Sequence, residues 1–431
     1  MTEIQTAAKV PDEIARAVVL PESYRDEQAI HKAYAWLRDN MPVGLAEVEG
    51  WDPVWLISKH EDITKVERSP DLYHIGDNNQ IFRTKASDKF QRDVLGGGSI
   101  RVLETLSAID PPDHTKFREL MMPWFMPESV RTFQDQIKRD AKEAVDRLRD
   151  LGGECEFTRD FAMLYPLRVI MTLLGVPRED EPLMLKLTQD FFGTREPDAK
   201  PAAPAADPAA IAKQWHAGIT GFFEYFDKLA DERRKRPTSD FVSLLANAQI
   251  DGKPIDRSHL NAFCLSMAAA GHDTTASSVS GGMLGLLTHP DQLAAVQADL
   301  SLVPGLVDES LRWSSPVKHF MRSARKDTEL KGQQIKEGDR LMLLYASANR
   351  DVAVFDDPYT FRVNRKPNRH LSMGTGHHAC VGQHVAKLEM RTLWEELLPR
   401  LRSAELLEEP TFIATNWVGG LKKLQVRYDV A

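Results

Sequence analysis

The chain has 431 residues, of which 42% are hydrophobic, and its formal net charge is −8. This composition provides for a sizeable apolar core, and the negative charge argues against nucleic acid as a partner. No uninterrupted apolar run approaches the roughly 18 residues that cross a bilayer, and three cysteines give no disulfide framework. Together with a first stretch that lacks the apolar region of a signal peptide, this predicts a cytoplasmic protein with no membrane partner.

The N-terminal third predicts short elements. Residues 1–25 have little periodicity, which indicates a loosely packed tail. A helix is expected over 29–38, a hairpin of short strands over 43–58 and a further helix from about Lys59. Glycines cluster near the end of 73–100, where we expect a mobile loop.

A helix start follows at Asp110-Pro111-Pro112-Asp113, since proline is tolerated in the first turn of a helix. His114 and Arg118 are four residues apart on it and therefore share one face. Taken alone, such a pair is more often an ordinary surface pair than a ligand-binding site.

Further helices are expected over 129–151 and 161–174. Residues 196–210 are rich in proline and alanine, and four prolines exclude a regular helix or strand there. We expect a mobile surface loop.

The longest predicted element is a helix from about Asp256 to His289, on the order of 50 Å long. Its middle carries small residues, and Ala270, Asp273 and Thr274 fall on one face. An acid is costly in an otherwise apolar helix. Two interpretations stay open here: packing of small residues against another helix, or a ligand site.

Downstream, Glu309 and Arg312 are spaced as an ion pair on a short helix that begins near Pro304, and Arg365 follows later. Strands are expected over 317–324 and 340–345. Alone, the Glu-x-x-Arg spacing has little diagnostic value.

Cys380 stands between glycines and histidines, immediately before a predicted helix. A helix N-terminus lowers the pKa of a thiol, and the resulting thiolate is a soft ligand suited to iron. Two other interpretations remain: a small buried hydrophobic residue, or a zinc site with His377, His378 and His384.

The stretch resembles the haem-binding loop of the cytochrome P450 superfamily, Phe-Gly-x-Gly-x-His-x-Cys-x-Gly. The matching positions are Gly374, Gly376, His378, Cys380 and Gly382. Met373 replaces the phenylalanine of the family, and we expect this change to affect the tuning of the iron but not its ligation.

The resemblance implies the P450 fold: a triangular, mainly α prism with a smaller β region, formed by one domain over residues 1–431, with a long central helix over the haem. It implies haem b as the cofactor, with Cys380 as the axial ligand of the iron. The implied partners of the haem propionates are His114, Arg118, Arg322 and His378. The implied proton-delivering residues are Asp273 and Thr274. The implied buried ionic network is Glu309, Arg312 and Arg365. The implied pocket wall is Ala270, Val317, Phe320 and Val418.

Within the superfamily, several stretches resemble the soluble bacterial terpineol-oxidising group: 270–275, 316–318, 347–351, 367–371 and 382–384. This resemblance implies O2-dependent hydroxylation of a C–H bond in a monoterpene or alkylbenzene. It also implies electrons from a [2Fe–2S] ferredoxin with an NAD(P)H-dependent reductase. We expect a neutral substrate, because no arginine in the predicted wall segments is free of another role. The alternatives are a peroxide-using haem-thiolate enzyme and a non-catalytic haem sensor.

Overall fold

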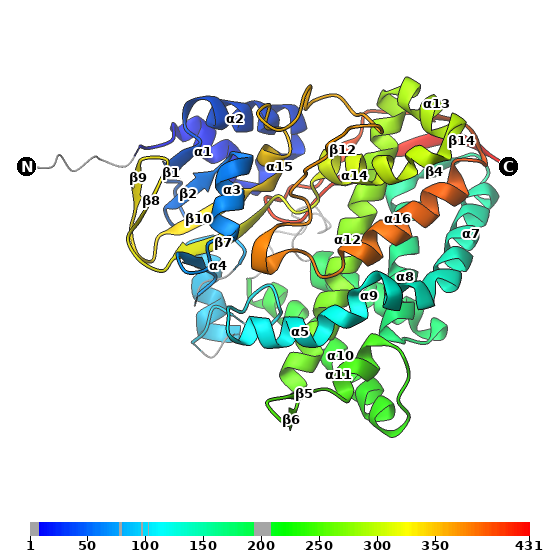
Figure 1. Cartoon of the computed structure of the whole chain (residues 1–431), viewed down its shortest axis with the longest axis horizontal. Helices are drawn as coiled ribbons and strands as arrows, with labels where there is room; N and C mark the ends of the chain where they lie inside the picture. Colours follow the sequence, from blue (N-terminus) through cyan, green and yellow to red (C-terminus); the bar gives the residue numbers. More distant parts are fainter. Residues whose placement is uncertain (1–7, 77–79, 96–97, 102, 194–207) are drawn as a thin grey trace, which may run out of the picture.

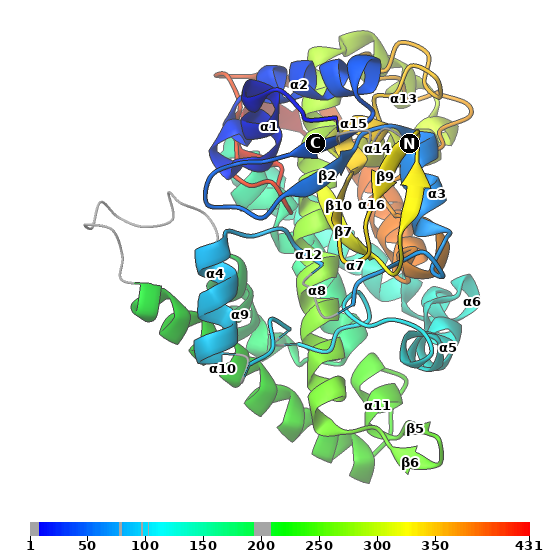
Figure 2. The same ribbon diagram turned by 90° about the vertical axis from the view of Figure 1, so that its left-hand side faces the viewer.

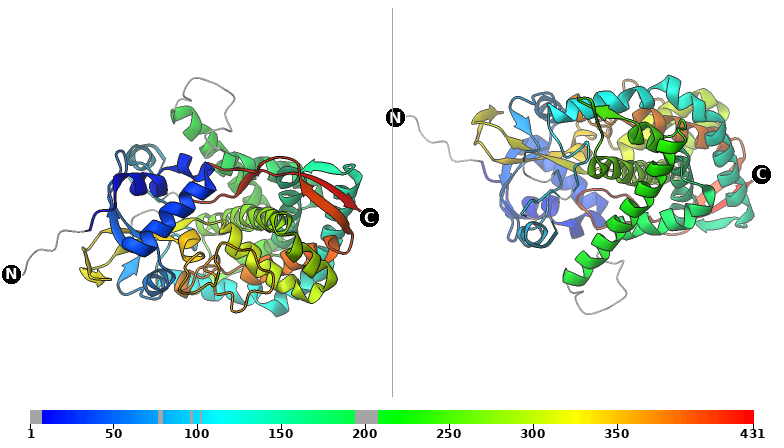
Figure 3. Two further views of the ribbon diagram at one scale, coloured as in Figure 1. Left: turned by 90° about the horizontal axis from the view of Figure 1, so that it is seen from above. Right: turned by 90° about the horizontal axis from the view of Figure 1, so that it is seen from below.

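The computed structural model describes residues 8–76, 80–95, 98–101, 103–193 and 208–431, with side chains left out at 188–193 and 208–217. A smaller part built around a sheet lies beside a larger helical part (Figure 1). Seen from above and from below, the sheet stays at one end and most helices at the other (Figure 3). The predicted class, mainly α with a smaller β region, is confirmed.

The α-helices, in chain order, are α1 (Asp12–Val19), α2 (Glu27–Asn40), α3 (His60–Glu67), α4 (Lys85–Phe90), α5 (Asp113–Phe125), α6 (Pro127–Val130), α7 (Gln134–Asp150), α8 (Leu164–Leu174), α9 (Glu181–Gly193), α10 (Pro208–Lys235), α11 (Phe241–Ala246), α12 (Arg257–Thr288), α13 (Pro290–Ala298), α14 (Val303–Ser314), α15 (Tyr345–Ala348) and α16 (Gln383–Leu397). Among the described residues, no helix has both the length and the apolar character needed to cross a membrane.

The main sheet has the order β1-β2-β10-β7-β3, and its pairs are antiparallel except for β10 with β2. Its strands are β1 (Val43–Ala46), β2 (Val54–Ile57), β3 (Tyr73–His74), β7 (His319–Ala324) and β10 (Arg340–Leu344). The smaller sheets are formed by β4 (Glu154–Glu156), β5 (Gln249–Ile250), β6 (Lys253–Pro254), β8 (Thr328–Leu330), β9 (Gln333–Ile335), β11 (Leu401–Leu406), β12 (Thr411–Phe412), β13 (Leu421–Lys423) and β14 (Gln425–Val430).

The sequence of strand β10 is apolar almost throughout, and the position of the strand in the fold explains this. Successive side chains point to opposite faces of a sheet. Leu341 and Leu343 belong to an apolar cluster on one face, and Met342 and Leu344 belong to a different cluster on the other face. Both faces of the strand are therefore buried, which a continuous apolar run satisfies.

The long helix α12 runs through the helical part (Figure 2). The side chain of Asp256 caps it by accepting the backbone N–H of His259 at 2.9 Å. Glycines let neighbouring elements approach closely: a Cβ at Gly282 would lie 2.3 Å from Ser310 of α14, and one at Gly285 would lie 2.5 Å from Phe361. The predicted helix is confirmed at both ends to within one residue.

The predicted loosely packed tail is wrong for residues 12–25, and residues 1–7 lie outside the described part. Helix α1 and the 3-10 helix η1 (Pro21–Arg25) bury Ala15, Val18 and Tyr24 in the cluster on one side of the sheet. An eight-residue helix is too short to be stable by itself, so packing against α2 decides its conformation.

The stretch predicted as a loop over 73–100 is more structured than expected. It contains β3, α4 and a short π-helical turn, η2 (Gln91–Leu95). Thr84 begins α4 by accepting the backbone N–H of Ser87 at 3.1 Å. The predicted loop at 196–210 falls almost entirely on 194–207, outside the described residues, and 208–210 belong to α10.

Candidate active site

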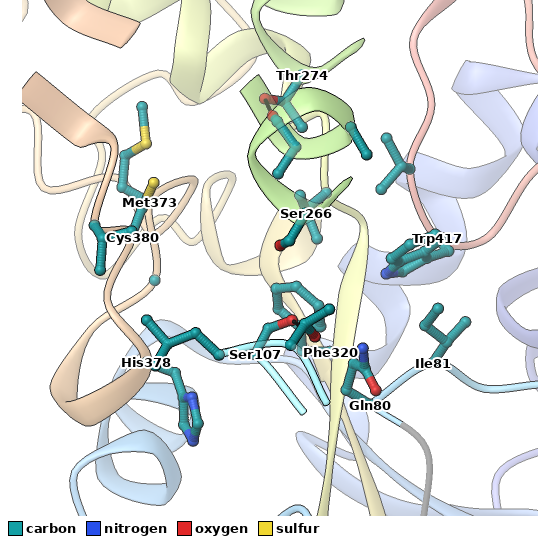
Figure 4. Close-up of a pocket in the computed structure, with 18 of the residues that line it drawn as sticks. Gln80, Ile81, Ser107, Ser266, Thr274, Phe320, Met373, His378, Cys380 and Trp417 are labelled. Carbon is teal, nitrogen blue, oxygen red and sulfur yellow. Dashed lines mark hydrogen bonds between the residues drawn. The ribbon is translucent and has the colours of Figure 1, made fainter. Parts of the chain in front are cut away.

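A cavity of about 320 Å3 lies between the middle of α12, β7, the loop before α16 and the segment between β3 and α5 (Figure 4). Nine of the predicted cofactor-binding, proton-delivering and wall residues line it: His114, Arg118, Ala270, Thr274, Val317, Phe320, His378, Cys380 and Val418. The fold therefore brings together predicted residues that are up to about three hundred positions apart in the chain.

The loop before α16 is held in shape by glycine. Gly374 and Gly376 have φ of +64° and +66°, a left-handed conformation that a side chain disfavours. A Cβ at Gly376 would also lie 2.4 Å from the carbonyl oxygen of Glu67. The backbone N–H of Cys380 donates to the carbonyl of Met373 at 2.8 Å, which closes the loop and places the thiol at the cavity.

The thiol of Cys380 differs from the sequence expectation in one respect. Burial raises its pKa, and the backbone N–H of Gly382 and the charge of Arg118 oppose that rise without cancelling it. The lowered pKa of Cys380 that was expected from the helix N-terminus is therefore wrong. A coordinated metal ion would itself remove the proton, because it stabilises the thiolate directly.

The zinc interpretation gains no support from the geometry. Within the described part of the chain, no three His, Cys, Asp or Glu side chains are grouped as a metal site. Cys380 can thus offer a metal one protein ligand, which suits a metal whose other ligands come from a cofactor.

Hydrogen-bond donors face the cavity beside this thiol. The rings of His114 and His378 lie 4.4 Å apart, and both nitrogens of His114 are buried without a hydrogen-bond partner among the described residues. Burial and the charge of Arg118 lower the pKa of His114 to about 4. A buried imidazole without a hydrogen-bond partner, next to an arginine, suits an acidic group placed in the cavity, such as the propionates of a haem.

Arg322, the fourth predicted propionate partner, does not line the cavity. Its guanidinium donates to the carbonyl of Met321 at 2.8 Å and lies 3.5 Å from the carboxylate of Glu67. The sequence does not indicate Glu67, because an acid at the end of an amphipathic surface helix is ordinary. The structure buries it, and it accepts the hydroxyl of Tyr345 at 2.6 Å and the N–H of Thr375 at 3.0 Å.

The middle of α12 presents its polar residues in different directions. Thr274 lines the cavity, and its hydroxyl donates to the carbonyl of Ala270 at 2.6 Å. Asp273 does not line it, and its carboxylate lies 3.2 Å from Nδ1 of the buried His272. The prediction that Ala270, Asp273 and Thr274 share one face therefore holds for two of the three.

A second acid, Glu389, is linked to the cavity by Thr275, which was not among the predicted site residues. The hydroxyl of Thr275 donates to Glu389 of α16 at 2.9 Å, and Thr275 itself lines the cavity. Burial raises the pKa of Glu389 well above its ordinary value, and the hydrogen bond from Thr275 opposes this rise only in part. The sequence signal that could have indicated this residue is an acid, Glu389, between the apolar Leu388 and Met390 of the predicted helix.

The remaining predicted residues form a buried ionic cluster behind the loop. Two nitrogens of Arg312 donate to Glu309 at 2.8 and 2.7 Å, and Nε of Arg365 lies 3.1 Å from the same carboxylate. Glu309 and Arg312 are completely buried. The structure thus joins these three residues as the resemblance implied.

Comparisons with known proteins agree with this geometry. The family model described as cytochrome P450 matches residues 104–427. Cytochrome P450-terp of a Pseudomonas species is 48% identical over 425 residues, which is 98% of this chain and 99% of that protein. Linalool 8-monooxygenase of Pseudomonas putida is 30% identical over 94% of this chain and 97% of that protein. The crystal structure of CYP108D1 from Novosphingobium aromaticivorans superposes with a TM-score of 0.91 at 39% identity, covering 98% of this chain and all of that one.

Proposed function

Because the chain belongs to the cytochrome P450 family, we propose that it hydroxylates a C–H bond of a small monoterpene or alkylbenzene, with electrons from a ferredoxin. One observation carries the proposal: the only predicted metal ligand, Cys380, and the helix residue Thr274 line the same cavity, whose wall is mainly apolar. We place this reaction in the cytoplasm, where NAD(P)H is available to a reductase.

The cofactor of the family is haem b, and the residues of the cavity fit it. Cys380 is positioned to ligate the iron, and the unpaired N–H of His114, with Arg118 and His378, suits its propionates. Arg322 contacts Glu67, and Glu67 itself lines the cavity. When bound, a thiolate-ligated haem supplies activation of O2 with cleavage of its O–O bond.

The protein's own residues supply binding, orientation and protons. The apolar wall excludes water from the bound substrate, and the small side chain of Ala270 leaves room on α12 for a flat ligand. Thr274 holds a hydroxyl at the cavity surface, and Asp273, one residue earlier, is 23% exposed and lies beside His272, outside the cavity lining. We propose that these two residues deliver the protons that the reaction consumes.

The substrate class is supported by relatives and by the wall. One relative is named as a linalool monooxygenase, and linalool is a monoterpene alcohol. Val317, Phe320 and Val418 contribute apolar surface, and Lys318 and His319 do not line the cavity. At roughly 25 cal/mol per Å2 of buried apolar area, a ten-carbon ring compound gains several kcal/mol.

A spin-state titration of the haem-loaded protein tests this substrate class. We expect cymene or terpineol to shift the iron to high spin with micromolar affinity. Other relatives are named as steroid C26-monooxygenases, so a steroid and a long-chain fatty acid belong in the same series. Tight high-spin binding of only the steroid or the fatty acid would contradict the proposed size of the substrate.

Two other functions make different predictions. A peroxide-using enzyme would turn over with peroxide alone, and a haem sensor would consume no NADH. The proposed function requires NADH consumption, coupled to product, in the presence of a reductase and a ferredoxin. An acid and an alcohol at the middle of α12 favour the O2-dependent reaction, because that reaction consumes protons.

Electron delivery is expected on the side of the ligand loop, where Lys366, Arg369 and Lys387 lie close to Cys380 in sequence. Lys387 is 41% exposed and lies 2.8 Å from Asp308, which reduces its effective charge. We therefore expect Lys387→Ala to slow ferredoxin-dependent turnover only a few-fold and to weaken its dependence on ionic strength.

Lys336→Ala is the matched control, since Lys336 is also exposed and paired, lying 2.8 Å from Asp327 beyond the far strand β9. Turnover and its salt dependence are measured at several ferredoxin concentrations for both variants. Equal behaviour of the two variants would exclude Lys387 from the docking surface.

A further inference from the structure

Among the described residues that line the cavity is an arginine that the proposed function does not use, Arg83. It lies between β3 and α4 and lines the cavity together with Gln80 and Ile81. In Figure 4, Gln80 and Ile81 stand on the opposite side of the cavity from Cys380 and Met373. This end of the cavity is therefore remote from the metal ligand and belongs to the space for the substrate.

The backbone near Arg83 explains why its side chain faces this space. Phe82 points into the core, where its ring lies 5.1 Å from that of Trp51, and its N–H donates to His319 at 3.0 Å. Thr84 then forms a bridge with the same Trp51. In extended chain, alternate residues share a side, so Ile81 and Arg83 both point away from Trp51 and toward the cavity.

The charge of Arg83 is not balanced by a direct partner. Its guanidinium makes no hydrogen bond or ion pair with any residue that the structure describes, although Asp88 attracts it from a longer distance. Asp88 lies 3.8 Å from Arg340 and so already has a cationic partner. Burial lowers the pKa of Arg83, yet an arginine stays protonated at neutral pH.

Arg101, the other arginine from this part of the chain that lines the cavity, is in a different situation. It donates to the carbonyl of Ala108 at 2.7 Å and lies 3.9 Å from Glu104. The guanidinium of Arg101 thus interacts with groups that are close to it in the chain. Arg83 is left as a cation that faces a largely apolar cavity, an arrangement that is unfavourable until an anion enters.

We propose that Arg83 binds a carboxylate at the end of the substrate remote from Cys380, so that the substrate is an acidic monoterpenoid or an alkyl-substituted aromatic acid. This inference rests on the proposed function, because it assigns the substrate class of the same cavity. A planar guanidinium can hold a carboxylate through two parallel hydrogen bonds. Anchoring the acid at this end would direct the opposite alkyl group toward Thr274 and the thiolate side.

The inference differs from the expectation of a neutral substrate. That expectation considered arginines only in the predicted wall segments of α12, β7 and the C-terminal region. Arg83 comes from the segment over 73–100, predicted as a loop, and the fold brings it to the cavity.

The test compares 4-isopropylbenzoate with p-cymene, which share the ring and the isopropyl group and differ by a carboxylate in place of a methyl group. Dissociation constants come from spin-state titrations of the haem-loaded protein. We expect the unmodified protein to bind the acid at least about tenfold more tightly than p-cymene, which corresponds to about 1.4 kcal/mol. In Arg83→Gln this preference should fall by at least about tenfold.

Two further variants complete the test. Arg92→Gln changes an exposed arginine nine residues away and should retain the preference for the acid. Arg83→Lys keeps the charge but loses the paired hydrogen-bond geometry, so we expect an intermediate preference for the acid. If Arg83→Gln fails to load haem, Arg83→Lys replaces it in the comparison.

The outcomes separate the inference from the proposed function. If p-cymene binds and the acid does not, or if Arg83→Gln and Arg83→Lys keep the full preference for the acid, the role of Arg83 is overturned and the proposed function stands. If neither compound nor any other terpenoid shifts the spin state or is oxidised, the proposed function fails and the inference fails with it.

Discussion

Cys380→His will load haem but lose the red-shifted ferrous–CO band that marks thiolate ligation. Its O2-dependent turnover should fall on the order of a thousandfold or more, about 4 kcal/mol of activation free energy. The reason is that a neutral imidazole donates less electron density to the iron than a thiolate and so favours cleavage of the O–O bond less. The cavity has room for the change, since Cys380 lies in a loop beside Met373 and not in a packed helix.

Cys264→Ser is the control for this experiment. Cys264 is buried in α12, does not line the cavity and should leave the CO band unchanged. A thiolate-type band in Cys380→His, or its loss in Cys264→Ser with haem still bound, would contradict the assignment of Cys380 as the ligand.

Glu309→Ala should have the largest effect on stability. It leaves Arg312 and Arg365 without the carboxylate that both contact, and it removes an acceptor from the backbone N–H of Arg362. Removing one partner of a buried ionic network costs about 3–5 kcal/mol, because the remaining charges stay buried and uncompensated. The free energy of unfolding by denaturant, measured on the haem-loaded protein, gives this number directly.

The pH dependence supplies a second signature. Burial raises the pKa of Glu309, but the hydrogen bonds and charge of Arg312 and then Arg365 outweigh it, so the folded pKa lies below the ordinary value. Such a group contributes its stability above its unfolded pKa of about 4.3 and loses it as the pH falls through the folded value. Glu309→Ala should therefore lose less stability on acidification than the unmodified protein does.

The exposed pair of Glu405 and Arg427, 2.7 Å apart, provides the comparison. Glu405→Ala should change the free energy of unfolding little, because water screens an exposed pair. If Glu309→Ala were as mild as Glu405→Ala, the buried network would not be a determinant of stability.

Residues with a local sequence signal were predictable. The loop from Gly374 to Cys380 and the small residues of α12 stand out in the sequence, since glycine and mid-helix polar residues need a special reason. The pairing of Glu309 with Arg312 follows from helical spacing. Together with the family resemblance that these residues carry, these signals predicted the fold class and four residues of the cavity wall.

Residues whose role depends on distant partners were not predictable. Glu67 gains its importance from Tyr345 and Thr375, which lie 278 and 308 positions away in the chain. Arg83 is unusual because Asp88 pairs with Arg340, and no described residue forms a hydrogen bond or ion pair with the Arg83 guanidinium. Burial also reversed the expected direction of the pKa of Cys380, and only the fold reveals how deeply that thiol lies.

The most direct test of the central claim is the origin of the oxygen atom in the product. Turnover of cymene or 4-isopropylbenzoate is run with NADH, reductase and ferredoxin under isotopically heavy O2. If the chain is a monooxygenase, the product alcohol carries one heavy oxygen atom per molecule. A product whose oxygen comes from water, or one formed only when peroxide is added, would contradict the account.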